Sequence, residues 1–151
     1  MNIPKVEYAV IGGSGTLSSD FPSKSMAEDI EILEDNLFFE TPYGPSPWFR
    51  LFRVGDKMHG WRTGVSRADA SRQLFWVFRE AGVKRIIAEG GVGTVNTLLD
   101  TRDFLIPDDY LDLSQRKDVG LEGKYLLIMR DSLCQEIREK LIENTNENYN
   151  G

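Results

Sequence analysis

"YAVIGGSGTL", residues 8–17, is an apolar run that stops at a glycine-rich turn. Val6 begins a stretch of β-branched and aromatic side chains that ends at Gly12, which predicts a buried strand followed by a tight turn. The backbone N–H groups of residues 12–15 can surround an anion, and the serine hydroxyl adds one donor. A turn of this composition can also serve only to redirect the chain. The stretch therefore leaves open whether its glycines hold a phosphate, a dinucleotide or nothing.

Two well-known phosphate-binding patterns do not fit this turn. A dinucleotide fingerprint in the frame of Gly13 and Gly15 requires a third glycine at the place of Ser18. A P-loop requires Gly-Lys followed by Ser or Thr, and that pattern is absent from the sequence. A dinucleotide-binding module therefore remains a hypothesis that rests on one Gly-x-Gly alone.

The composition excludes several classes of function. A chain of 151 residues with 40% hydrophobic residues predicts one domain with a core. Because 24 acidic residues outnumber 18 basic ones and no basic block occurs, nucleic acid is not an expected partner. No apolar run reaches membrane-spanning length and the N-terminus lacks signal-peptide character, so we expect a cytoplasmic protein without membrane contact. The single cysteine, Cys134, excludes an internal disulfide and is expected to be buried.

Apolar residues are spaced as in strands in some segments of the chain and as in helices in others. Strand, helix and strand joined by short loops predict parallel pairing. We therefore expect an α/β fold with a mixed, mostly parallel central sheet flanked by helices. Expected strands cover residues 6–11, 30–33, 37–40, 48–54, 85–88, 104–106 and 125–129. Turns are expected at 34–36 and 42–47, a glycine loop at 89–93, helices at 66–81 and 132–143, and an exposed polar tail at 143–151.

A lone histidine and three arginines follow the strand expected at 48–54. His59 is the only histidine and no second one exists to build a metal site, so no metal is expected. Arg62, Arg67 and Arg72 can bind an anion with bidentate geometry. They can also lie as solvated side chains on a helix surface, and the sequence leaves both readings open.

The order of the motifs is more specific than any one of them. The first strand ends in Gly-Gly-Ser-Gly, and Glu-Thr-Pro-Tyr-Gly-Pro-Ser follows at residues 40–46. His-Gly follows at 59–60, and Asp-Phe-Leu-Ile-Pro-Asp at 103–108. This order resembles the purine nucleoside phosphorylase family, especially its 5'-methylthioadenosine phosphorylase branch. The resemblance spans residues 6–142.

The resemblance implies an enzyme that cleaves the N-glycosidic bond of a purine (thio)nucleoside, such as 5'-methylthioadenosine, in purine salvage. Such a pentosyltransferase uses inorganic phosphate as co-substrate and no cofactor. Gly13, Ser14 and Gly15 are then expected to hold phosphate, and His59 is expected to lie beside phosphate and ribose as the catalytic residue. The remaining phosphate- and substrate-binding residues that the resemblance implies are Arg62, Arg72, Glu89, Gly90 and Gly91.

The sequence departs from the family pattern at several positions, and the family's second histidine is missing near residues 62–64. Met58 stands where the family has an arginine, and Glu89 stands where it has a threonine. A carboxylate facing phosphate repels it unless a cation compensates. These differences leave open a nucleosidase-like relative, or a noncatalytic relative that binds a nucleoside.

The resemblance also implies partners. Residues 1–151 are expected to form the N-terminal, phosphate-side part of a single nucleoside phosphorylase-like domain. The base-binding half then comes from a C-terminal segment or from a partner chain. A trimeric assembly is expected, because the methylthioadenosine branch is typically trimeric.

Overall fold

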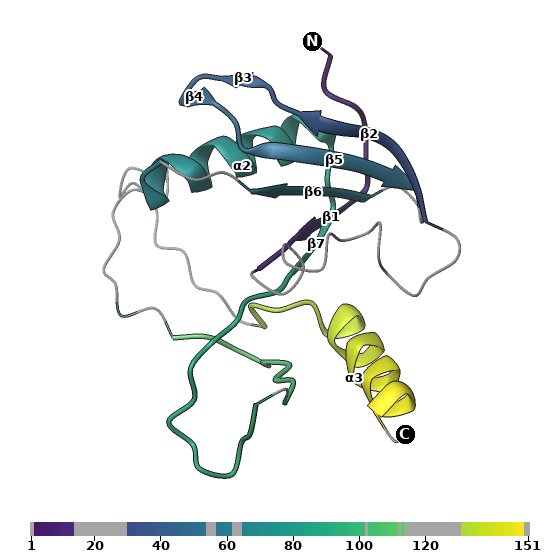
Figure 1. The fold of residues 1–151 in the computed structure, drawn as a ribbon, viewed down its shortest axis with the longest axis vertical. Helices are drawn as coiled ribbons and strands as arrows, with labels where there is room; N and C mark the ends of the chain where they lie inside the picture. The colour runs from purple at the N-terminus through teal and green to yellow at the C-terminus, as the bar shows by residue number, and fades with distance from the viewer. Residues whose placement is uncertain are drawn as a thin grey trace. The chain divides into compact units, whose positions relative to one another are not determined.

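In the described residues of the N-terminal part, a five-stranded mixed sheet and a small two-stranded sheet lie with helix α2 (Figure 1). The computed structural model describes residues 2–13, 30–53, 57–61, 65–101, 103–111, 113 and 131–149. The strands are β1 (Tyr8–Ile11), β2 (Glu31–Leu37), β3 (Glu40–Thr41), β4 (Gly44–Pro45), β5 (Trp48–Arg53), β6 (Lys57–Trp61) and β7 (Arg85–Ala88). The helices are α2 (Arg67–Ala81) and α3 (Gln135–Tyr149). The chain divides into two compact units, Met1–Gly93 and Thr94–Gly151.

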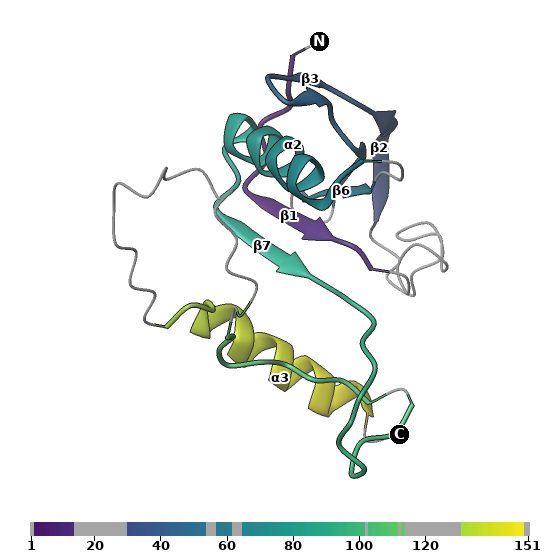
Figure 2. The same ribbon diagram turned by 90° about the vertical axis from the view of Figure 1, so that its left-hand side faces the viewer.

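The sheet has the strand order β2-β5-β6-β1-β7. β1 pairs in parallel with β6 on one side and with β7 on the other, and Figure 2 shows β1 and β7 side by side. β5 runs antiparallel to both β2 and β6. The expected α/β class and mixed sheet are confirmed, but the described pairings are half antiparallel rather than mostly parallel. The reason is β6, which the sequence did not reveal: only residues 54–56 separate it from β5, and so short a connection joins antiparallel neighbours.

The core of the N-terminal unit lies between the sheet and α2. Val77, Phe78 and Ala81 of the helix are buried in one cluster with Ala9 of β1 and Phe49 of β5. The Phe49 and Phe78 rings meet edge to face with centroids 6.0 Å apart. Phe49 is 1% exposed and Val77 0% exposed, so this contact holds the helix on the sheet.

Helix α2 confirms the sequence prediction at both ends. The Ser66 hydroxyl accepts a hydrogen bond from the Asp69 backbone N–H at 3.1 Å, as an N-cap does. Gly82 follows the helix in the left-handed region, at φ +82°, and its N–H reaches Arg79 O. Val83 N–H then donates to Phe78 O at 3.0 Å, which ends the helix before β7. The predicted strand at 85–88 has the bounds of β7.

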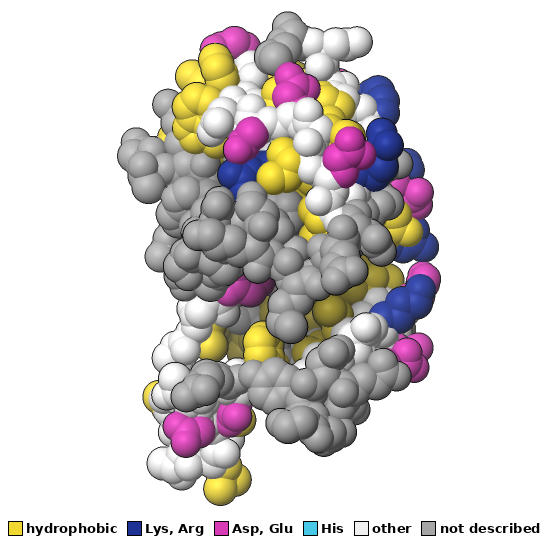
Figure 3. All heavy atoms as spheres, turned by 45° about the vertical axis from the view of Figure 1, so that its right-hand side comes forward, with side chains coloured by type: hydrophobic (Ala, Val, Ile, Leu, Met, Phe, Trp, Pro, Cys, Tyr) yellow, Lys and Arg dark blue, Asp and Glu magenta, His cyan; other side chains and the backbone are white. Residues whose placement is uncertain are grey.

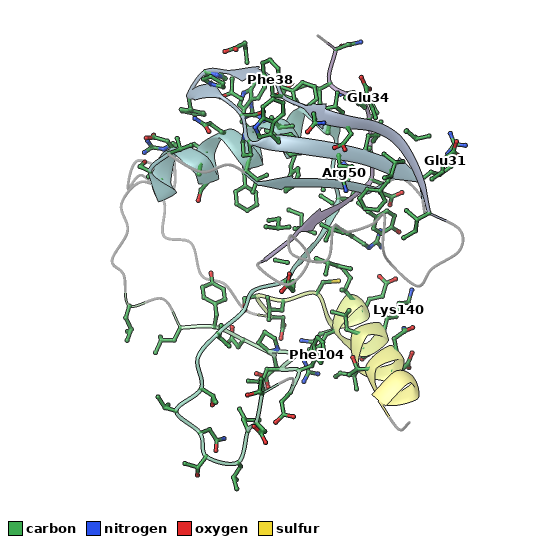
Figure 4. The ribbon with its side chains drawn as sticks, in the orientation of Figure 1. Glu31, Glu34, Phe38, Arg50, Phe104 and Lys140 are labelled. Atoms are coloured by element: carbon green, nitrogen blue, oxygen red, sulfur yellow. The ribbon has the colours of Figure 1, made fainter. Side chains whose placement is uncertain are left out.

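The turn predicted at residues 34–36 is wrong. These residues lie inside β2, which continues to Leu37 with shifts of register against β5. Asn36 has a φ of +56°, a conformation that asparagine tolerates, so a bulge absorbs the polar triplet without ending the strand. Across the bulge, Arg50 of β5, labelled in Figure 4, donates from Nε and Nη2 to the two Asp35 carboxylate oxygens at 3.0 and 2.9 Å. The strand predicted at 37–40 is therefore split between the end of β2 and the start of β3.

The C-terminal unit contains α3 and an extended segment. The helix expected at 132–143 begins later, at Gln135, and runs to Tyr149. The tail predicted at 143–151 is thus helical as far as Tyr149. Cys134 is exposed rather than buried. Residues 104–106 form no strand, and the strand expected at 125–129 lies outside the described residues.

Candidate functional site

Three neighbouring strands run in parallel and direct their carboxyl ends to the same edge of the sheet. These strands are β6, β1 and β7, with β1 in the middle. In α/β sheets, ligands bind outside the carboxyl ends of the strands. The turn that includes Gly13 follows β1, and Glu89 follows β7. The topology therefore brings two predicted site segments together although 76 positions separate Gly13 from Glu89.

A short hydrogen bond joins these two segments. The Gly13 N–H donates to Glu89 Oε2 at 2.6 Å. The Glu89 main chain is fixed in turn, because its N–H donates to Ile11 O at 2.9 Å and extends the pairing of Ile11 with Ala88. The approach is so close that a Cβ atom on Gly13 would lie 2.8 Å from Glu89 O and 3.0 Å from Gly90 Cα. Position 13 therefore requires glycine for reasons of space.

His59 lies within strand β6. The sequence placed it just after a strand, and the structure corrects this: His59 is the third residue of β6, in register with Val10 of β1 and with Arg50 of β5. Its backbone is thus on the strand next to β1. The His59 side chain lies outside the part of the structure that is described. Its catalytic role remains a prediction.

The Thr-Pro-Tyr-Gly motif forms the hairpin between β3 and β4. The Thr41 hydroxyl donates to Gly44 O at 2.6 Å and accepts from the Tyr43 N–H at 3.1 Å. Gly44 has a φ of +95°, which suits glycine. Gln73 of α2 donates from Nε2 to Tyr43 O at 2.9 Å, and Arg72 lies over the Tyr43 ring at 5.9 Å. The motif thus fixes the hairpin to the helix.

Gln73 was missed by sequence reasoning. Its side chain is 2% exposed, on the helix face that also carries Ala70 and Val77. The available signal was a polar residue at the helical spacing of apolar ones, which predicts a buried side chain with a specific partner. That partner is the hairpin that carries Tyr43.

The predicted site residues separate into three groups. Gly13 and Glu89 are in contact, Gly90 adjoins them, and Gly91 follows in the same loop. Arg72 contacts Tyr43 and pairs with Asp69 at 3.7 Å. The predicted residues that lie outside the described part of the chain are Ser14, Gly15 and Arg62.

Among the described residues, the carboxyl groups of Asp35 and Asp109 have lowered pKa values, and both lie away from the Gly13–Glu89 contact. Hydrogen bonds from the Arg50 side chain hold the pKa of Asp35 below its usual value of 3.8. In the C-terminal unit, a hydrogen bond from the Ser132 hydroxyl, with a further one from the Tyr110 N–H, lowers the pKa of Asp109.

The described surface carries mixed charge. Figure 3 shows acidic and basic side chains interspersed on the face that it draws. Within the described ranges, histidine, cysteine and acidic side chains form no group of three that could hold a metal ion. Neither described helix is long and apolar enough to cross a membrane.

Comparison with known proteins identifies the family that the motifs indicated. Residues 7–150 match the phosphorylase superfamily. An S-methyl-5'-thioadenosine phosphorylase of Saccharolobus solfataricus is 27% identical over 95% of this chain and 54% of its own length. A probable S-methyl-5'-thioinosine phosphorylase of Methanothermobacter thermautotrophicus is 30% identical over 87% of this chain and 48% of its own. For a 6-oxopurine nucleoside phosphorylase of Pyrococcus furiosus these values are 28%, 89% and 53%. The chain thus spans about half the length of these relatives.

Proposed function

Because the chain belongs to the phosphorylase superfamily, we propose that it carries the phosphate end of a site that cleaves the N-glycosidic bond of a purine (thio)nucleoside. Inorganic phosphate is the acceptor, and no cofactor takes part. The observation that carries this proposal is the meeting of β6, β1 and β7, with Gly13 and Glu89 in contact at their carboxyl ends. This edge is where an α/β sheet holds its ligand.

The proposed reaction requires an anion held in place rather than strong acid and base groups on this side. A phosphate oxygen bonds to C1' of the sugar while the C1'–N bond breaks, and the bonding electrons leave with the purine, which takes up a proton. The sugar passes through an oxocarbenium-like state, which a positioned anion stabilises. In this chain the Gly13 N–H is one described donor for that anion.

The other predicted residues take roles around this donor. In the proposal, Ser14 and Gly15 also bind the anion. His59, whose backbone is on the strand beside β1, is assigned the place next to phosphate and ribose. Arg62 follows β6 in the sequence, and in the proposal it contributes positive charge toward phosphate. The remaining members of the proposed substrate-binding set are Arg72, Gly90 and Gly91.

The substrate class rests on the relatives. Their names give 5'-methylthioadenosine, 5'-methylthioinosine and 6-oxopurine nucleosides as substrates of those proteins. These molecules share a purine joined to a ribose or thioribose by an N-glycosidic bond. We place the substrate of this protein in the same class, in a cytoplasmic pathway.

A second half completes the site. The chain spans only 48–54% of the relatives named above. Several apolar side chains in the described residues of the C-terminal unit are exposed, including Leu98 at 89% and Leu111 at 81%. Exposed apolar surface of this kind marks an interaction surface. The base-binding half, supplied by a partner chain or a further segment, covers it in the proposed trimeric assembly.

One observation favours a second candidate function. Glu89 Oε2 already holds the Gly13 N–H, where a phosphate oxygen would bind. A nucleosidase-like relative transfers the sugar to water and needs no phosphate, and a noncatalytic relative binds the nucleoside without turnover. Both alternatives fit a glycine turn whose Gly13 N–H already donates to the Glu89 carboxylate.

The deciding experiment measures purine release by the chain together with its completing half. 5'-Methylthioadenosine and inosine are each incubated with and without inorganic phosphate, and adenine or hypoxanthine is quantified. Release that depends on phosphate supports phosphorolysis. Equal release without phosphate supports the nucleosidase-like alternative, and nucleoside binding without release in either condition supports the noncatalytic one.

A further inference from the structure

The contact between Gly13 and Glu89 bears on how the site chooses its acceptor. The Gly13 N–H donates to Glu89 Oε2 at 2.6 Å, and the carboxylate acceptor makes this a charge-assisted hydrogen bond. Such a bond is about twice as strong as one between neutral groups. A side-chain oxygen of this chain thus occupies the donor that the proposed function gives to phosphate.

Strand pairing places the Glu89 backbone close to Gly13. β1 and β7 pair in parallel through Ile11 and Ala88, and the Glu89 N–H adds a further bond to Ile11 O at 2.9 Å. Glu89 is therefore fixed beside the end of β1 by its main chain. Its side chain needs only to turn toward Gly13 to reach the N–H.

Glu89 and Gly90 leave no room for a side chain at Gly13. A Cβ on Gly13 would come within 3.0 Å of Glu89 Oε2 as well as within 2.8 Å of Glu89 O. Glu89 is partly buried, so its carboxylate is screened less than one on the open surface. A phosphate oxygen cannot occupy the same place on the Gly13 N–H, and a second anion nearby is repelled.

We infer that Glu89 is a specificity-determining residue that acts as a built-in anion: its carboxylate holds the Gly13 N–H, and phosphate binds only after displacing it. This inference rests on the proposed function, in which the same turn binds phosphate. Glu89 then sets the phosphate concentration at which the site is filled. The chemistry of the ligand is that of a free oxyanion with one oxygen to place on the Gly13 N–H.

Phosphate binding to the full chain tests this inference without turnover. Inorganic phosphate is titrated by calorimetry into the wild type and into the variants Glu89→Gln and Glu89→Ala. The first removes the charge and keeps the shape, and the second also removes the competing oxygen. We expect both to bind phosphate at least about tenfold more tightly than the wild type, the effect of removing one nearby like charge and one competing bond. Circular dichroism checks that each variant is folded.

Glu7→Gln is the matched control. Like the Glu89 variants, it removes one acidic side chain from the N-terminal unit. Glu7, however, precedes β1, whereas Gly13 follows it. Glu7 also pairs with Arg85 on the surface, at 3.1 Å. Its phosphate affinity is expected within about twofold of the wild type, because an exposed charge at the other end of the strand is screened.

The outcomes separate this inference from the proposed function. Equal phosphate affinity in the wild type and both Glu89 variants overturns the inference and leaves the proposed function standing. If neither the wild type nor the Glu89 variants bind phosphate, both are overturned. Tighter binding by the Glu89 variants without purine release from the completed assembly supports the inference and contradicts the proposed function.

Discussion

The two units of the chain differ in what covers their apolar side chains. In the N-terminal unit, Phe49 and Val77 are almost fully buried between the sheet and α2. In the described residues 94–113 of the C-terminal unit, Leu98, Leu111 and Leu113 are each at least 79% exposed. The first unit therefore holds its own core, whereas these apolar residues of the second unit lie exposed. The difference indicates which unit generates its own stability, and it is the reason that we propose the C-terminal unit as the place where a completing half attaches.

The largest expected effect separates two phenylalanines. Phe49→Ala opens a cavity in the core and is expected to lower the free energy of unfolding by about 3–5 kcal/mol. Phe104→Ala, at a side chain that is 66% exposed, is expected to change it by less than about 0.5 kcal/mol in the chain alone. Urea denaturation measures both. Similar losses for the two variants would show that residue 104 is packed as firmly as the core, and the comparison of the units would break.

A smaller loss in the free energy of unfolding is expected when a buried hydroxyl is removed. Ser46 is 2% exposed, and its Oγ accepts from the Phe39 N–H at 2.9 Å and donates to Pro47 O at 2.8 Å. Ser46→Ala leaves that N–H buried without its partner, so a loss of about 1–3 kcal/mol in the free energy of unfolding is expected. Ser132→Ala removes a hydroxyl from the C-terminal unit and serves as the control. An equal loss in the control would contradict the comparison.

The next smaller loss in the free energy of unfolding is expected at the N-cap of α2. Ser66→Ala removes the acceptor for the Asp69 N–H and is expected to cost about 1 kcal/mol. Ser71→Ala, inside the same helix, removes a hydroxyl without touching the cap and is expected to be neutral or slightly stabilising. Thermal unfolding of the two variants gives the difference. If Ser71→Ala were the more damaging change, the cap would not be what begins the helix.

The smallest effect depends on pH. The pKa of Asp35 is lowered in the folded protein by hydrogen bonds from Arg50, so its contribution is complete above the usual pKa of 3.8 and is lost as the pH falls through the lower folded value. Asp35→Asn is expected to cost about 0.5 kcal/mol at pH 7, because the carboxylate is 40% exposed. The cost disappears in strong acid. Urea denaturation from pH 7 to pH 2 follows it, and a cost that persists at pH 2 would exclude the ion pair as its cause.

Much of the fold was readable from local signals. The strand before the glycine turn, helix α2 and strand β7 each followed from the spacing of apolar residues. β6 was missed because its sequence, Lys-Met-His-Gly-Trp, lacks the alternation typical of strands, and its pairing with β1 and β5 overrides that weakness. The bulge at Asn36 was mistaken for a turn for the same reason: local composition does not show the partner strand.

The candidate site was predictable in its parts but not in its contacts. From the sequence, the glycine turn was recognised as a candidate anion site, and Glu89 was recognised as a departure from the family pattern. The sequence did not show that Glu89 Oε2 would bind the Gly13 N–H, since that bond joins residues 76 positions apart and depends on the register of β1 and β7. Long-range pairing carries no local signal, so only the structure reveals it.

The identity of the sugar product tests the proposed phosphorolysis most directly. Phosphorus NMR follows 5'-methylthioadenosine and inorganic phosphate with the chain and its completing half. The expected result is a sugar 1-phosphate signal that grows at the rate at which inorganic phosphate disappears and adenine is released. Adenine released while inorganic phosphate stays constant, with free sugar as the other product, would contradict phosphorolysis.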